Sequence, residues 1–134
     1  KAVSAGSYYD ADSLGPSSFT IYGSPRPCVT LPEIEQAVDA ELDRVAKDGV
    51  TTDEVARAKK RLVASAVFAR DSFTAGARTL GAALAVGRKV ADVEAWPDRI
   101  TAVTAEEIQA AAKYVFVKKH SVTAFLVEDK EKPE

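Results

Sequence analysis

The 134-residue sequence has very few of the side chains that bind transition metals or form disulfides. It contains one cysteine, one histidine and no methionine. The single cysteine, Cys28, cannot form an internal disulfide, so cysteine usage gives no information on the redox compartment. A zinc peptidase motif of the type His-x-x-Glu-His needs two histidines one helical turn apart, and the chain has only His120. The sequence therefore excludes a zinc centre of that type within these residues.

The sequence also lacks an initiating methionine and a long apolar run. It starts at Lys1, whereas an open reading frame normally begins with Met, so we expect it to be part of a longer protein. The longest apolar stretches, such as residues 82–86, are much shorter than the roughly 18–20 residues that span a bilayer. We therefore expect no membrane span.

Charge of one sign is not in excess. The chain has 18 basic and 20 acidic residues, a net charge of −2, so no bulk attraction to nucleic acid or anionic membranes follows. Hydrophobic residues at 46% and charged residues at 28% are ordinary globular values. A chain of this length is one domain, and we expect it to bury roughly two-thirds of its unfolded surface around one core.

The first thirty residues favour extended structure. Residues 2–9 and 17–22 alternate loosely between apolar and polar side chains, and residues 10–16 between them are rich in turn-forming types. An antiparallel hairpin is the simplest connection. The prolines in Ser24-Pro25-Arg26-Pro27 are expected to end the second strand.

Three helix starts share one pattern, Val-Thr-x-x-Glu followed by Ile or Val. The threonines are Thr30, Thr51 and Thr104. In each case threonine can cap the helix while glutamate reaches back to the cap's own N–H, and the flanking apolar residues form a staple. The pattern predicts helices that begin at these three threonines.

The remaining boundaries follow from local signals. We expect the first helix to end at Asp48-Gly49, and the second to run from 51 to about 87 with a break at 70–74 where Asp71 or Ser72 caps a new helix. Pro97 either starts or breaks a short helix between 91 and 102, and the last helix runs to about 117. The apolar stripes predicted on the first three helices are Ile34, Val38, Leu42 and Val45; Val55, Ala58, Leu62 and Ala69; and Phe73, Ala77, Leu80 and Leu84.

Residues 121–127 alternate like a strand, and residues 129–134 are a charged tail that we expect to be disordered. Because about three strands are needed for a stable sheet, the last strand should return to the hairpin. The predicted fold class is α+β, with a small antiparallel sheet packed against several helices.

No set of residues in the sequence forms a complete active site. His120 is interpreted as an exposed loop side chain, and Cys28 as an inert thiol rather than a nucleophile. Asp10 and Asp12 with Gly15 resemble part of a calcium loop, but the loop's final glutamate is missing and a turn explains them more simply.

Two further groups have structural interpretations. The basic run Lys59-Lys60-Arg61 spreads around a helix, which favours a solvated face over a nucleic-acid site. Trp96 and the pair Tyr8-Tyr9 are interpreted as anchors of a core or of a domain interface. We therefore assign no catalytic, cofactor-binding or metal residue.

Several motifs together resemble one known family. They are residues 18–23, 47–51, 53–59, 70–72, 96–100, 103–108 and 121–123. In this order and spacing they are similar to the pitrilysin/insulinase-like zinc metallopeptidases. The resemblance identifies residues 1–128 as a truncated C-terminal domain, part of a metallopeptidase-like α/β repeat, of a two-domain bacterial subunit.

The resemblance implies a scaffold role. In the family the zinc ligands and the catalytic glutamate lie in the N-terminal domain, and none of them maps onto this chain. The expected partners are that metal-bearing domain or subunit, with a peptide substrate held in the chamber between two halves, and a homodimer or heterodimer fits the family. The family's full domain starts with a further strand and helices, without which the sheet would have an unprotected edge.

Two alternatives stay open. The chain resembles equally the non-catalytic partner subunits of the same family, which serve as core proteins or regulatory partners. A free-standing α+β binding module is the third interpretation. The sequence does not assign a compartment, since bacterial relatives occur in the cytoplasm and in the periplasm, the latter being the preferred expectation.

Overall fold

The computed structural model describes residues 1–69 and 72–127 of the chain, in which helices predominate and one β-hairpin is present. The elements are β1 (Ala2–Tyr9), β2 (Phe19–Pro25), α1 (Leu31–Asp48), α2 (Thr52–Ala69), α3 (Phe73–Ala85), α4 (Val90–Glu94), α5 (Trp96–Ala102), α6 (Ala105–Val115) and the 3-10 turn η1 (Lys118–His120). This composition confirms the predicted α+β class. The predicted tail, residues 129–134, lies outside the described residues.

The two strands form the antiparallel hairpin that the sequence predicts. Tyr9 is opposite Phe19 at the tip, and Ala2 is opposite Pro25 at the open end, with a register irregularity between Ala2 and Ser4. β2 runs three residues past its predicted end, through Pro25. Proline is tolerated there because Pro25 is the last residue of a strand that, among the described residues, is paired on one side only.

The three predicted helix starts are confirmed by their capping hydrogen bonds. The Thr51 N–H donates to Glu54 Oε2 at 2.7 Å, and the Glu54 N–H donates back to Thr51 Oγ1 at 3.2 Å. Thr104 makes the same pair of bonds at the start of α6. At Thr30 both the N–H and the hydroxyl donate to Glu33 Oε2, each at 2.8 Å. The boundaries are therefore fixed by short-range interactions.

The predicted end of α1 is also confirmed. Gly49 has φ +78° and its N–H donates to the Val45 carbonyl at 3.0 Å. This positive φ is one that residues with a Cβ rarely adopt, so glycine is needed at this turn.

Two boundaries that the sequence left open are settled. Ser72 caps α3, because its hydroxyl accepts a hydrogen bond from the Ala75 N–H at 3.3 Å, while Asp71 lies outside the described residues. Pro97 is the second residue of α5, so it starts this helix rather than breaking it.

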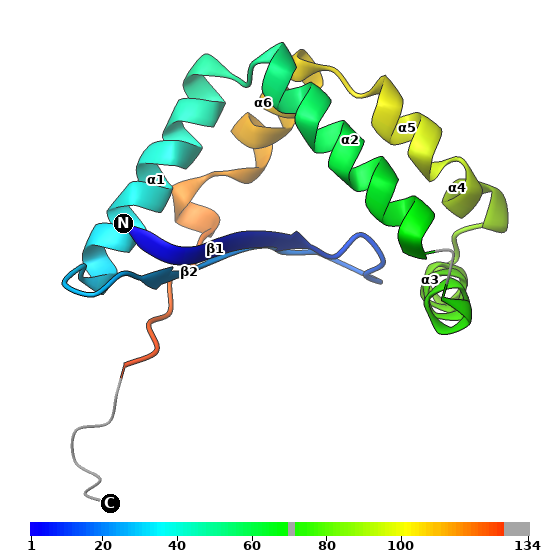
Figure 1. The fold of residues 1–134 in the computed structure, drawn as a ribbon, viewed down its shortest axis with the longest axis horizontal. Helices are drawn as coiled ribbons and strands as arrows, with labels where there is room; N and C mark the ends of the chain where they lie inside the picture. Colours follow the sequence, from blue (N-terminus) through cyan, green and yellow to red (C-terminus); the bar gives the residue numbers. More distant parts are fainter. Residues whose placement is uncertain (70–71, 128–134) are drawn as a thin grey trace, which may run out of the picture.

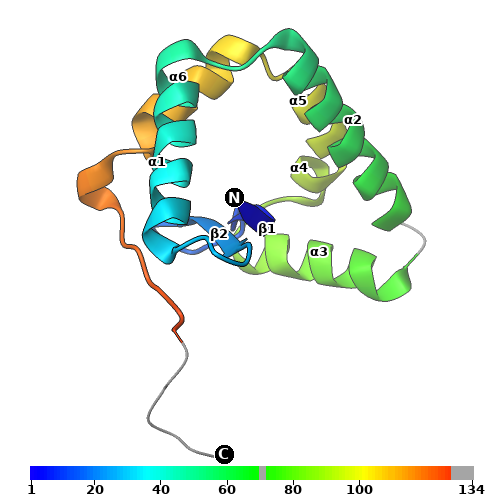
Figure 2. The ribbon, with the colours of Figure 1, turned by 60° about the vertical axis from the view of Figure 1, so that its left-hand side comes forward.

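The elements follow one another around a ring (Figure 1 and Figure 2). α1 packs along α6 and touches β2, α2 packs along α5, and α4 contacts both α3 and α5. The Arg88 guanidinium, just after α3, pairs with the Asp12 carboxylate at the hairpin tip, with 2.6 Å between Nη1 and Oδ1. This ion pair joins the two ends of the ring.

The expectation of one substantial core is wrong for the part of the chain that the structure describes. Val55, Ala83 and Ala112 are its only buried hydrophobic residues. The chain exposes 10953 Å², whereas a compact monomer of this mass exposes about 6,800 Å². It therefore buries about half of its unfolded surface rather than two-thirds. The ring geometry is the reason, because each helix packs mainly against one or two neighbouring elements and leaves its other faces open.

The predicted apolar stripes are accordingly only partly covered. Val55 at the start of α2 is buried, but Leu62, two turns further on, is 44% exposed, and Leu84 on α3 is 50% exposed. The 3.6-residue periodicity correctly marks these faces as apolar, but it does not say what covers them.

The third strand predicted at residues 121–127 is a further correction. This segment is unpaired in the structure, and the side chains of Val122 and Leu126 are each 96% exposed. It follows η1 and runs away from the hairpin in both views of the ribbon (Figure 1 and Figure 2). Alternation and β-branched residues make a segment suited to a sheet, but a strand forms only where a partner edge is available.

Candidate functional site

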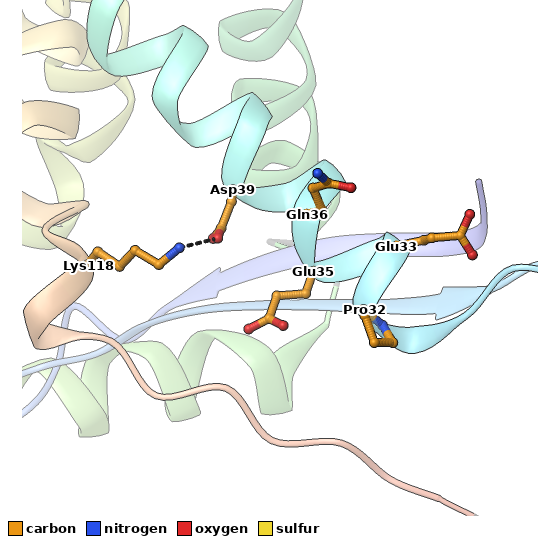
Figure 3. Close-up of a pocket in the computed structure, with 6 residues that line it drawn as sticks. All are labelled: Pro32, Glu33, Glu35, Gln36, Asp39 and Lys118. Carbon is orange, nitrogen blue, oxygen red and sulfur yellow. Dashed lines mark hydrogen bonds and ion pairs between the residues drawn. The ribbon is translucent and has the colours of Figure 1, made fainter.

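The first candidate site is a shallow hollow at the N-terminal end of α1, shown in Figure 3. Its lining residues are Pro32, Glu33, Glu35, Gln36, Asp39 and Lys118. Lys118 comes from η1 and the others from α1. The Lys118 Nζ donates to Asp39 Oδ2 at 2.8 Å, and Figure 3 shows this ion pair at one side of the hollow.

Three of the four charged residues of this hollow, Glu33, Asp39 and Lys118, take part in structural interactions. The hydrogen bond to Asp39 is the largest cause of a raised pKa of Lys118, and the negative field of Glu35 and Asp43 adds to it. The Thr30 N–H and hydroxyl lower the pKa of Glu33, which serves as part of the helix cap. The hollow is therefore a polar surface on which Glu33, Asp39 and Lys118 are held by structural contacts.

The same holds for the other shifted groups among the described residues. Hydrogen bonds from their own caps or ion pairs lower the pKa of Glu41, Glu54 and Glu106, and the bond to Glu41 raises the pKa of Arg44. Every one of these shifts moves the pKa of the group further from pH 7. A general acid or base works best with a pKa near the working pH, so these shifts favour a structural role for the groups.

The second candidate is an apolar groove between the hairpin and α1. Its lining residues are Lys1, Ala2, Ala5, Gly6, Ser7, Ile21, Gly23, Ile34, Ala37, Val38, Glu41 and Leu42. Ile34, Val38 and Leu42 lie one turn apart on α1 and are three members of the predicted apolar stripe. Each of them is only half-buried, so the groove has room for further packing.

The residues considered for metal binding do not come together. Within residues 1–69 and 72–127 no group of three or more His, Cys, Asp and Glu side chains is placed to hold a metal ion. His120 is an exposed residue of η1, and Cys28 is exposed in the loop before α1, with φ +67°.

The aspartates of the first loop form a turn. The Asp12 N–H donates to Asp10 Oδ1 at 3.0 Å, and the Ser17 hydroxyl donates to the Asp10 carbonyl. The Asp12 carboxylate pairs with Arg88. Both carboxylates therefore have hydrogen-bond or ion-pair partners within the protein, and their positions are accounted for without a calcium ion.

The remaining candidates are structural or exposed. The Lys59 Nζ donates to the Thr101 carbonyl at 2.7 Å, which holds α2 against α5. Trp96 is half-buried at the start of α5, whereas Tyr8 and Tyr9 are exposed on β1.

Sequence reasoning missed two long-range contacts that position α6. The Gln109 Nε2 donates to the carbonyls of Lys47 at 2.9 Å and Ala46 at 3.2 Å, at the C-terminal end of α1. Phe116 meets Phe19 edge to face, with the ring centroids 5.3 Å apart. No local signal marks these partners, because each pair is separated by more than sixty residues.

Comparison with known proteins gives a match for the first part of the chain. A family model described as the Peptidase M16 inactive domain matches residues 1–62. Residues 1–62 are therefore similar to the inactive domain of the M16 peptidases. The match includes the hairpin, α1 and the first part of α2, and it confirms the resemblance to the pitrilysin/insulinase-like peptidases. No curated protein matches the chain.

The apolar groove lies entirely within the M16 segment, since all its lining residues fall between 1 and 42. M16 C-terminal domains pair with other domains or subunits, and the match of residues 1–62 supports a scaffold role at the level of the family. None of the helices in the described part of the chain is long and apolar enough to cross a membrane.

Proposed function

We propose that residues 1–128 form a C-terminal scaffold segment of a zinc-dependent endopeptidase, where they form part of the wall of a substrate chamber. The single observation that carries this proposal is the match of residues 1–62 to the inactive domain of a peptidase family. A domain of that kind contributes shape and contacts to an enzyme whose catalytic residues lie elsewhere.

The zinc of the proposed enzyme does not fit this chain. The whole sequence holds one histidine and one cysteine, and the side chains that could serve as ligands do not cluster in the described residues. We therefore place the proposed zinc in another domain or subunit and derive no step through it.

This chain presents an apolar surface on a structure that is stabilised by helix caps and an ion pair. The capped helices and the Arg88–Asp12 pair hold the ring, and the groove between the hairpin and α1 presents half-covered aliphatic side chains. Burying such a surface stabilises a complex by about 25 cal/mol for each Å² removed from water. We propose that the metal-bearing half of the enzyme covers this groove.

The test is association of the chain with a metal-bearing M16 domain, measured by calorimetry. The variant Val38→Asp places a charge in the groove and is expected to weaken binding at least about tenfold, since burial of an unpaired carboxylate is costly. Ala40→Asp, on the exposed face of the same helix, is the matched control and should bind like the unchanged chain.

Circular dichroism of both variants checks that the helices are retained. Equal affinity of the Val38→Asp and Ala40→Asp variants, or no complex with the unchanged chain, would contradict the proposal.

A further inference from the structure

We draw no further inference here: the strongest candidate, the acidic cluster of Glu35, Asp39 and Asp43 on α1, already faces Lys118 of η1 through its ion pair with Asp39, and no second feature among residues 1–69 and 72–127 points to a ligand for it.

Discussion

Gly49 is the residue at which backbone geometry constrains the sequence most directly. Its φ of +78° with ψ −159° lies in a region that essentially only glycine occupies, and a Cβ there would meet the Gln109 side chain at 3.4 Å. We predict that Gly49→Ala lowers the free energy of unfolding by about 1–3 kcal/mol. Urea denaturation followed by circular dichroism measures this change.

Gly15 provides the control for this substitution. A Cβ at Gly15 would meet nothing within 4 Å, and its φ is not positive. Gly15→Ala should therefore change the free energy of unfolding by less than about 1 kcal/mol. Equal losses at both positions would show that the backbone argument for Gly49 is wrong.

Glu54 gives a pH-dependent prediction. Its pKa is lowered from 4.5, first by the hydrogen bond from the Thr51 N–H and then by the Thr51 hydroxyl. A lowered folded-state pKa adds stability above the unfolded-state value and loses it as pH falls through the folded value. The free energy of unfolding should therefore decline between about pH 5 and pH 3.

The variant Glu54→Gln isolates this contribution. Because it has no carboxylate at the cap, its free energy of unfolding should fall less steeply over the same pH range, as measured by urea denaturation at each pH. Identical slopes in the variant and the unchanged chain would rule out the cap as a source of the pH dependence.

At the scale of single residues, the sequence predicts a hydrogen bond well where its two partners are close together in the chain. Thr51 and Glu54 are three residues apart, so their interaction could be read from spacing. Gln109 could not be assigned, because its acceptors on Ala46 and Lys47 lie over sixty residues away and any polar surface residue has the same local pattern.

The ring of helices and strands is closed where the turn after α3 meets the tip of the hairpin. The Arg88–Asp12 pair links the turn after α3 to the hairpin tip, and both side chains are partly buried, at 27% and 28% exposed. We predict a coupling energy of about 1 kcal/mol in a double-mutant cycle of Arg88→Ala and Asp12→Ala, at the upper end of values for exposed pairs.

Arg57 and Asp53, one turn apart on α2, form the comparison pair. They are separated by 2.7 Å but are 67% and 74% exposed. The same cycle on this pair should give only about 0.3 kcal/mol. A coupling for Arg88 and Asp12 no larger than this would contradict their role in closing the ring.

For helices and strands, the sequence predicts which elements form better than it predicts which elements pair or pack together. The hairpin forms because its turn residues bring two strands together within a short loop. Residues 121–127 carry an equally good alternation, yet their pairing depends on an edge that the rest of the chain must place beside them. The predicted third strand was wrong for this reason, while Pro97 needed the observed position in α5 to decide its role.

At the scale of the whole molecule, the fold class was predictable and the extent of burial was not. The apolar stripes correctly identify faces that favour burial, such as those of Leu62 and Leu84, but both remain about half exposed. The periodicity of the sequence shows which face of a helix is apolar. How much of that face is buried depends on how the helices and strands are arranged. The groove between the hairpin and α1 arises from that arrangement, so the sequence alone could not locate it.

We propose that this chain contributes structure to a peptidase rather than its catalytic metal. The decisive test is to incubate the purified chain with excess zinc, remove unbound metal by gel filtration, and measure zinc per chain alongside peptide hydrolysis. We expect zinc far below one ion per chain and no hydrolysis. One tightly held zinc ion per chain, with cleavage of peptides by the chain alone, would contradict it.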